Sequence, residues 1–566
     1  MTSETSAAIQ PGECIEFWAR RRAQSPWYLR VQHPDGRTLY ALESLGDHFE
    51  FFSYTNRSGD RVVLTARTEA IAFSYFYVYD RATVAELGVI FWEFVSGEVH
   101  RYSGTGLQTW MARDPTRPAL HFTPFKNWIN DPNGLCLVGD TYHLFYQFHP
   151  HSTDWGPMHW GHATSTDLYR WRHLPVFLHP EQNLERLGAT GGAFSGTACT
   201  DGEGQVRFYY TERLPAYGLF KGYTEVQKLL QADSPLLKPV AIRTVLEGGA
   251  AGTGCDIRDP KVWWDKAAGA YRMILGSSIE GDPSVLLYGS PDGVSWSFID
   301  VLYRAPAQFR EHGARCIECP DFFPLEGHWV LTMGFVGYHE PDSGRHNLLY
   351  ASVGSFQDDK FSSELPLQEL DFGTDYYAMQ SFSAKGRQLA MAWMFNWEFR
   401  KPVDSDFSGE MALPRVLSLD TQRRLCMNPD EGLYRWKSKR VLATSVDDVI
   451  RPEGQPFELQ LGGRLTGLYI EGRDDQGHRF VLMEEDSSLL MFAPQDQGKI
   501  SYRSRPVELT DVRLFFDRGI LEVFANGGAV CGTRRSYDIL NPCEVTIRTP
   551  RAHDVDQFSA HALVDE

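Results

Sequence analysis

Short runs of alternating apolar and polar residues, closed by turn-forming residues, recur along most of the chain, and helical periodicity is hard to find. Runs such as TYHLFYQF (141–148), RFYYT (207–211) and YRMILG (271–276) have the two-residue period of β-strands. Turn signals lie between such runs, among them Pro-Asp-Gly at 34–36 and Asp-Pro-Asn-Gly at 131–134. The pattern predicts an all-β protein.

The expected strands are grouped in a way that predicts three domains. Between about 121 and 436 they fall into about five clusters of roughly 60 residues, a spacing typical of four-stranded propeller blades. We therefore expect a five-bladed β-propeller at 111–440. Alternating strands at 441–566 match the size of a β-sandwich. The aromatic, strand-rich block at 1–110 is expected to be an accessory β-rich domain, whose function the sequence does not reveal.

Composition and charge exclude several classes of protein. Hydrophobic residues make up 42% of the 566 residues and charged residues 23%, the balance of a globular protein. No apolar run approaches the ~18 residues that a membrane-spanning helix needs. The formal net charge of −18 disfavours binding to nucleic acid or to an anionic membrane. We expect neither as a partner, and the oligomeric state cannot be read from the sequence.

The first residues and the cysteines favour a cytoplasmic location. The segment MTSETSAAIQPGECIEF has neither the basic region nor the apolar region of a secretory signal. Nine cysteines are scattered from Cys14 to Cys543 without the short spacings of a disulfide framework, which fits a reducing compartment.

Several motifs for metals, cofactors and nucleophiles are absent. Eight of the 18 histidines fall between His121 and His179, but none has the H-E-x-x-H spacing of a metal site. Cys316 and Cys319 form one C-x-x-C pair without a second pair, so chance spacing is favoured. The chain has no G-x-S-x-G element, Walker loop or dinucleotide fingerprint. We expect no metal and no cofactor.

Three carboxylates among aromatic residues remain as candidates for chemistry. Asp131 opens Asp-Pro-Asn-Gly, which a plain β-turn would also explain. Asp259 follows Arg258, a natural partner that would keep the carboxylate ionised, although a structural ion pair is the alternative. Glu318 has weakly polar neighbours, where desolvation would suit a general acid. Residues so far apart in the chain can share one site if strands converge, as they do in a propeller.

The stretch HFTPFKNWINDPNGLCLVGDTYHLFYQFHP (121–150) resembles glycoside hydrolase family 32, which includes invertases, inulinases and levanases. The family's W-x-N-D-P-N-G block matches at 128–134 and its F-Y-Q element at 145–147. Further matches follow in family order: Phe194-Ser195-Gly196, Arg258-Asp259-Pro260, Glu318-Cys319-Pro320, DFGTDYYA (371–378), Trp393 to Trp397 and Leu413-Pro414-Arg415. The segment VRLFFDRGILEVFANGG (512–528) resembles the family's C-terminal module, so the resemblance covers about 121–566.

The resemblance implies a role for each carboxylate. Asp131 would be the nucleophile on the anomeric carbon of a fructosyl unit, and Glu318 the general acid and then the base. Asp259, held by Arg258, would stabilise the oxocarbenium-like transition state, and the reaction would retain configuration. The positions that match the terminal-fructose pocket of the family are Asn130, Gln147, Trp155, Phe194, Ser195, Arg258, Asp375 and Trp393.

The resemblance predicts a β-fructofuranosidase that removes terminal fructose from sucrose or short fructo-oligosaccharides. A fructosyltransferase or a levan- or inulin-specific exo-hydrolase on the same site is the alternative, and a non-catalytic fructan-binding protein is disfavoured by the three intact carboxylates. Two departures from the family pattern are expected to affect leaving-group subsites and substrate length. They are Tyr210-Thr211-Glu212-Arg213, where relatives often carry Tyr-Thr-Gly, and Glu410 after Phe407-Ser408-Gly409.

Overall fold

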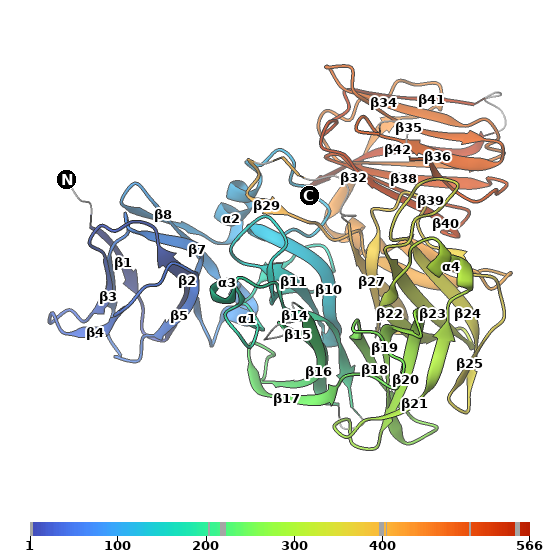
Figure 1. The fold of residues 1–566 in the computed structure, drawn as a ribbon. Coiled ribbons are helices and arrows are strands. Elements are labelled where there is room, and N and C mark those ends of the chain that lie inside the picture. Colours follow the sequence, from blue (N-terminus) through green and yellow to red (C-terminus); the bar gives the residue numbers. More distant parts are fainter. Residues whose placement is uncertain are drawn as a thin grey trace.

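The computed structural model describes residues 4–201, 204–215, 222–394, 401–402, 404–496, 500–549 and 555–565. The chain is mostly β, as the alternating pattern predicts, and its strands follow one another along the molecule from the N-terminal sheets to the C-terminal sheets (Figure 1). The strand expected at 141–148 is β11 (Thr141–His149), which is one residue longer than predicted.

The N-terminal strands form two antiparallel sheets (Figure 1). The first has the order β1 (Thr5–Ile9), β6 (Val62–Arg67), β3 (Tyr28–Gln32), β4 (Thr38–Ala41). The second has the order β5 (Glu50–Thr55), β2 (Glu13–Arg21), β7 (Ile71–Asp80), β8 (Ile90–Val95), β9 (Glu98–Tyr102). A core of side chains such as Phe17, Leu64 and Phe76 lies between them.

The longest sheet in the middle of the chain joins two antiparallel meanders. Its order is β17 (Pro239–Glu247), β16 (Tyr223–Ala232), β15 (Val206–Pro215), β14 (Gly191–Thr200), β12 (Pro157–Ser165), β11 (Thr141–His149), β10 (Asn127–Val138), β29 (Phe407–Ser408), with β13 (Arg172–His173) on β12. A short parallel pairing of β12 with β14 connects the meanders.

Three further antiparallel sheets complete the middle of the chain. The first contains β18 (Arg258–Asp265), β19 (Ala270–Ile279), β20 (Asp282–Ser290) and β21 (Ser297–Arg304). The second contains β22 (Cys316–Leu325), β23 (His328–Val336), β24 (Leu349–Gln357), β25 (Lys360–Ser363) and β26 (Gln368–Glu369). The third contains β27 (Tyr377–Ala384), β28 (Arg387–Trp393), β30 (Arg415–Leu419) and β31 (Leu425–Pro429).

The C-terminal strands form two facing sheets, a β-sandwich as the sequence predicts (Figure 1). One has the order β32 (Lys437–Ala443), β42 (Val555–Asp565), β33 (Phe457–Gly463), β38 (Asp511–Asp517), β39 (Ile520–Ala525), β40 (Val530–Arg535). The other has the order β37 (Tyr502–Arg503), β36 (Ser488–Phe492), β35 (Arg479–Glu485), β34 (Tyr469–Arg473), β41 (Glu544–Arg548).

Helices are few and short in the described ranges. They are α1 (Val84–Leu87), α2 (Gly104–Met111), α3 (Leu184–Leu187), α4 (Ala307–Glu311) and the 3₁₀ helix η1 (Glu431–Arg435). None of these helices has the length and apolar character needed to span a membrane.

Five strands of the middle sheets are neighbours although they are far apart in sequence. Strand β10 contacts both β14 and β27, β18 contacts β14 and β22, and β22 contacts β27. Each of the five has a shift in pairing register near its N-terminal end, after Ile129, Ala193, Arg258, Glu318 and Tyr377. A β-bulge bends its strand and re-aims side chains. The bulges therefore lie side by side at one end of these strands.

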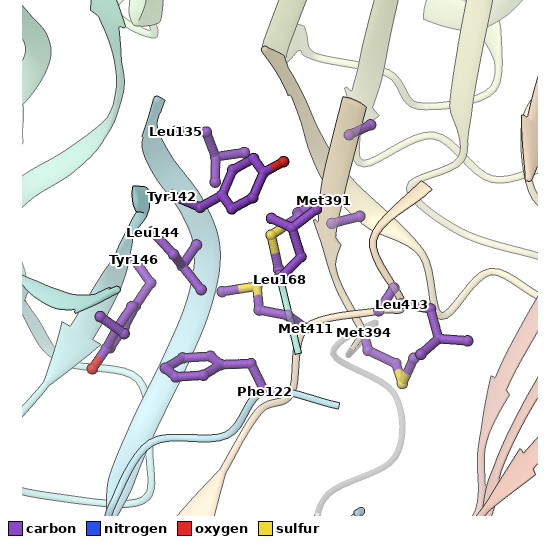
Figure 2. Packing of buried hydrophobic residues seen from close by; sticks show 14 of the residues in the cluster. Phe122, Leu135, Tyr142, Leu144, Tyr146, Leu168, Met391, Met394, Met411 and Leu413 are labelled. Carbon is purple, nitrogen blue, oxygen red and sulfur yellow. The ribbon is translucent and has the colours of Figure 1, made fainter. Parts of the chain in front are cut away.

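The largest core connects the N-terminal sheets to the middle of the chain. It includes Trp18 and Phe91 of the N-terminal strands together with Phe125 and Phe148, and the rings of Phe91 and Phe125 stack 4.0 Å apart. Figure 2 shows another part of this core, where Tyr142 and Leu144 of β11 lie close to Met391 and Met411. The N-terminal sheets thus share a buried core with the sheets in the middle of the chain.

Candidate active site

The five neighbouring strands β10, β14, β18, β22 and β27 are the inner strands of the middle sheets. A cavity of about 390 Å³ opens at their bulged ends. Asp131 of β10, Asp259 of β18 and Glu318 of β22 all line it. Residues 128 and 59 positions apart in the sequence therefore reach one site, as convergent strands require. The positive φ angles of Asp259 (62°) and Cys319 (47°) mark the bulges that turn these segments toward the cavity.

The Asp131 carboxylate is held by three hydrogen-bond donors. Ser195 donates its hydroxyl to Oδ2 at 2.5 Å, Asn130 donates from Nδ2 to Oδ1 at 3.2 Å, and the Cys319 thiol lies 3.5 Å from Oδ2. Gln147 in turn donates from Nε2 to the Ser195 oxygen at 2.5 Å. Burial raises the pKa of Asp131, and the hydrogen bond from Ser195 opposes that rise. The arrangement fixes the carboxylate while leaving it in contact with the cavity.

Asp259 is buried and fixed mainly by backbone contacts. The Cys319 backbone N–H donates to its Oδ2 at 2.7 Å, and its own N–H donates to the Thr211 hydroxyl oxygen at 3.0 Å. Burial raises the pKa of Asp259 to about 7, and the positive charge of Arg258 only partly opposes this. Arg258 therefore favours the ionised form of Asp259, as expected, but only through a long ion pair of 3.9 Å, and burial outweighs its effect.

Arg258 makes its shorter contacts with other carboxylates. Its Nη1 lies 2.6 Å from Asp256 Oδ1 and 3.3 Å from Glu225 Oε1, and its Nη2 lies 3.2 Å from Glu318 Oε2. Two of these partners, Asp256 and Glu225, are buried. Arg258 is thus the centre of a charged cluster at the cavity wall, and it lies closer to Glu318 than to Asp259.

Glu318 has polar partners rather than the weakly polar surroundings that its sequence neighbours suggest. The Tyr377 hydroxyl donates to its Oε1 at 2.6 Å, and Arg258 donates to Oε2. The side chain is 21% exposed, whereas those of Asp259 and Arg258 are 4% and 8% exposed. Of the two cysteines beside it, Cys316 is fully buried and the Cys319 thiol contacts Asp131.

Aromatic rings form the apolar walls of the cavity. Trp155, Phe194, Tyr377 and Trp393 line it and belong to one apolar cluster. Trp128 supports this wall from behind, because its ring lies 5.8 Å from that of Trp393 and its indole N–H donates to Asn130 at 2.8 Å. Apolar walls with a few fixed polar groups are typical of small-molecule sites.

Most of the residues expected in the pocket come together here. Asn130, Gln147, Trp155, Phe194, Arg258 and Trp393 line the cavity, and Ser195 touches Asp131 and Gln147 from a fully buried position. Asp375 is the exception. Its Oδ2 accepts the Arg535 backbone N–H at 2.7 Å and pairs with the Arg534 guanidinium, so it joins β40 of the C-terminal sandwich instead of facing the cavity.

The two departures from the family pattern also lie in different places. Arg213 lines the cavity with its guanidinium 3.6 Å from the centre of the Tyr223 ring, which fits an effect on the leaving-group side. Thr211, however, holds the backbone of Asp259. Glu410 is fully buried and pairs with Arg535 at the contact with the sandwich, so the expectation that it bears on a subsite is wrong.

Several cavity residues were not among those expected. Tyr377, Cys319, Asp256, Tyr223, Arg315 and Asn347 all line it. Tyr377 lies within the DFGTDYYA segment, so a sequence signal existed, although it did not distinguish Tyr377 from Asp375. Arg315 and Tyr223 lie outside the matched motifs, and only the folded chain brings them to the cavity.

The histidine-rich segment is buried in several unrelated contacts. His121 lies between Asp517 and Glu522, His143 contacts His162, and the rings of His159 and His179 lie against Trp18. Within the described ranges, no group of three or more His, Cys, Asp or Glu side chains is arranged to hold a metal ion. All nine cysteines carry free thiols.

Comparison with known proteins relates this geometry to one family. The model of the glycosyl hydrolases family 32 N-terminal domain matches residues 121–429, and that of the family's C-terminal region matches residues 478–560. The chain belongs to glycosyl hydrolases family 32. It is accordingly a glycoside hydrolase, and the matched ranges contain every residue described above as lining the cavity.

Relatives in family 32 cover most of the chain. A sucrose-6-phosphate hydrolase of Zymomonas mobilis is 32% identical over 437 residues, which are 72% of this chain and 83% of that protein. A levanase of Bacillus subtilis is 30% identical over 462 residues, 73% of this chain and 65% of the levanase. The structure of a family 32 glycoside hydrolase from Bifidobacterium adolescentis matches with a TM-score of 0.87 at 24% identity and covers 100% of both chains. The N-terminal sheets are therefore part of a fold that this family 32 structure shares.

Proposed function

We propose that this family 32 protein is a retaining glycoside hydrolase that cleaves terminal, non-reducing β-D-fructofuranosides, with sucrose and short fructo-oligosaccharides as substrates. The observation that carries the proposal is the convergence of Asp131, Asp259 and Glu318 from three inner strands on one cavity with aromatic walls. Glycoside hydrolases use a pair of carboxyl groups that flank the bond to be cleaved. When one of them acts as a nucleophile, the product keeps the anomeric configuration of the substrate.

The surroundings of each carboxylate support a separate role. Asp131 is oriented by Ser195, which suits a nucleophile that must attack one carbon from one direction. Glu318 is more exposed than Asp259 and has Tyr377 and Arg258 as partners, which suits a group that gives and then takes a proton. Asp259, fixed by the Cys319 N–H, suits a group that accepts hydrogen bonds from fructose hydroxyls in the transition state.

We also propose that the middle of the chain is a five-bladed β-propeller. The ring of contacts among β10, β14, β18, β22 and β27 supports this arrangement, with one blade built outward from each. The boundaries expected at 110 and 440 fall inside α2 (Gly104–Met111) and β32 (Lys437–Ala443), so we propose limits a few residues earlier, before each of these elements. In such a propeller the first halves of all five inner strands face one end of the axis.

The leaving-group side of the cavity suggests a second candidate substrate. Arg315 lines the cavity with a side chain that is 63% exposed, and it lies 3.9 Å from Asp256. A guanidinium in this position suits a phosphate on the leaving sugar. Sucrose 6-phosphate, named in the relative from Zymomonas mobilis, is therefore a candidate beside sucrose. The relative from Bacillus subtilis is a levanase, so levan is the polymeric alternative.

A substrate panel tests the proposal. Wild type and Asp131→Asn are incubated separately with sucrose, sucrose 6-phosphate, 1-kestose, inulin and levan, and the released sugars are quantified. We expect fructose from the short substrates and at least about a 10³-fold loss in Asp131→Asn, equivalent to about 4 kcal/mol. The exposed Asp300→Asn serves as the matched control and should retain activity. Glucose released in excess of fructose would instead indicate fructosyl transfer.

A substitution at Arg315 separates the two short substrates. Arg315→Ala should raise KM for sucrose 6-phosphate and leave KM for sucrose nearly unchanged if this residue binds the phosphate. An equal effect on both substrates would assign Arg315 to a general role in the cavity. We further propose a cytoplasmic location with sugars as the only small-molecule partners, which the nine free thiols and the net charge of −18 support.

A further inference from the structure

A second cavity lies at the other ends of the same five inner strands. Its volume is about 470 Å³, larger than that of the candidate active site, and within the range of small-molecule sites. Each inner strand contributes to it beyond its bulge, through Leu135 of β10, Thr197 of β14, Lys261 of β18, Phe322 of β22 and Ser381 of β27. No residue lines both cavities, so the two are separate sites on opposite ends of one set of strands.

Three partly buried tryptophans line this second cavity. The ring of Trp329 stacks on Phe322 at 4.6 Å with an interplanar angle of 25°, and the ring of Trp263 lies 5.5 Å from Phe322. Trp264 lies edge to face with Tyr271 at 4.8 Å. Each ring is therefore fixed by packing against the protein, and each retains partial exposure. Fixed indole rings beside polar groups suit the apolar C–H faces and the hydroxyls of a sugar.

Polar groups lie among these rings. The Lys261 ammonium is 2.7 Å from Asp321 Oδ1 and donates to the Ser381 carbonyl oxygen at 2.7 Å, so two of its three N–H groups have these partners. The Trp263 indole N–H is buried without a hydrogen-bond partner in the part of the chain that the structure describes. Gln388 bridges Ser381 and Ser383 through its amide at 2.9 and 2.6 Å. The cavity thus offers donors and acceptors within an aromatic frame.

The charges of the lining favour a neutral ligand. Lys261 is neutralised by Asp321 directly behind it, and Lys266 at the rim is accompanied by Asp265. An anionic ligand would have to compete with these carboxylates, and a cationic ligand with the lysines. A neutral sugar avoids both costs and can use the paired groups as donors and acceptors.

We propose that this second cavity is a binding site for a neutral saccharide, such as the end of a fructo-oligosaccharide, and that it does not take part in hydrolysis. The choice of fructo-oligosaccharide rests on the proposed function. The linings of the two cavities approach to within two to four residues on each inner strand, as with Asp259 and Lys261 of β18, but no residue is shared between them. A ligand in the second cavity therefore leaves the first one open.

Equilibrium dialysis of labelled 1-kestose against the full-length Asp131→Asn protein tests the proposal. We expect two bound equivalents, because the substitution blocks turnover and retains both cavities. Adding Trp263→Ala should weaken one of the two binding events at least about tenfold, since a truncated aromatic anchor has effects of this size. Trp27→Ala, on the N-terminal sheets, is the matched control and should retain two equivalents.

A second variant guards against misfolding of Trp263→Ala. Ser383→Trp on the exposed rim should fill the cavity without removing a core side chain, and it should also abolish the second equivalent. In the active background, both variants should keep the kcat/KM of wild type on sucrose. A single equivalent in Asp131→Asn that neither variant changes would overturn the inference.

The outcomes separate this inference from the proposed function. Wild-type hydrolysis of 1-kestose together with one bound equivalent, unaffected by Trp263→Ala and Ser383→Trp, would reject the second site alone. Binding that both variants remove, in a protein that releases no fructose from any substrate, would support the second site and reject the proposed function.

Discussion

Ser195 donates its hydroxyl to Oδ2 of Asp131 at 2.5 Å while it accepts a hydrogen bond from Gln147, also at 2.5 Å. The three side chains come from β14, β10 and β11, so one chain of hydrogen bonds connects three strands at the proposed nucleophile. Because Gln147 supplies a donor, the Ser195 hydrogen is directed to the carboxylate. The serine therefore stabilises the ionised form of Asp131 against the effect of burial.

Replacing Ser195 with alanine should slow the reaction and change its pH dependence. A hydrogen bond to a charged group contributes about 1.5–3 kcal/mol, so kcat/KM should fall about 10- to 150-fold. Without this donor the pKa of Asp131 rises further, and the acid limb of the profile should move to higher pH. Initial rates on sucrose across the pH range measure both effects. Ser352→Ala, a buried serine paired with Ser363, is the control, and an unmoved limb in Ser195→Ala would contradict the assignment.

Replacing Arg258 should affect both stability and activity. Arg258→Met leaves buried Asp256 and Glu225 without their shared guanidinium, and loss of one partner from such a cluster costs about 3–5 kcal/mol. The pKa of Asp259, already raised to about 7 by burial, should rise further when the nearby positive charge is lost. If the reaction requires ionised Asp259, the acid limb of the kcat/KM profile should therefore move to higher pH.

The Arg258→Lys variant separates charge from geometry. It keeps a positive charge and loses the planar fork, so its acid limb should move less than that of Arg258→Met. Thermal unfolding and pH–rate profiles of both variants provide the test. If Arg258→Met keeps the acid limb of wild type while its thermal midpoint falls, Arg258 has only a structural role.

His121 pairs with Asp517 and Glu522 of the C-terminal sandwich, and we expect the stability that this contact adds to depend on pH. Burial alone would lower the pKa of His121, but hydrogen bonds to Asp517 and Glu522 raise it to about 9 from 6.5. A group with a raised folded-state pKa adds stability that is present below pH 6.5 and lost as the pH rises through 9. The shift corresponds to about 3 kcal/mol.

His121→Gln should therefore lower the thermal midpoint strongly at pH 6 and much less at pH 10. Differential scanning calorimetry at several pH values follows the difference from wild type, with the exposed His100→Gln as the control. A difference that stays constant between pH 6 and 10 would show that His121 is not charged in the folded protein.

The sequence predicted many of the strands and most of the segments that line the cavity, because both depend on local patterns. The alternation in TYHLFYQF places Gln147 opposite Tyr146, and the structure has Gln147 at the cavity and Tyr146 in the large core. The segments around Asp131, Asp259 and Glu318 meet because each lies at the same level of an inner strand.

The contacts that the sequence did not predict are those between segments. Adjacent residues suggested that Arg258 pairs with Asp259, but that ion pair is long, at 3.9 Å, and Arg258 makes its shorter contacts with Asp256, Glu225 and Glu318. Asp375 shares a segment with Tyr377, yet its partners are Arg534 and Arg535, about 160 residues later in the chain. A sequence motif contains only residues that are close in sequence. The partners of a buried charge come from the strands that pack beside it, which a motif does not identify.

The covalent step is the central claim, and Glu318→Gln tests it most directly. This variant can neither protonate the leaving glucose nor activate water, so it should lose most activity on sucrose. A fructoside with an activated leaving group needs little protonation, and its first step should survive. The expected result is a burst of leaving group equal to the enzyme concentration, followed by slow turnover as fructosyl-Asp131 accumulates.

Azide, which needs no general base, provides the decisive readout in this variant. It should accelerate the slow phase and yield fructosyl azide, whose anomeric configuration is determined by NMR. Retained configuration is the result that a two-step reaction through Asp131 predicts. Inverted fructosyl azide, or equal losses on activated and natural substrates without a burst, would contradict the covalent mechanism and the roles of Asp131 and Glu318.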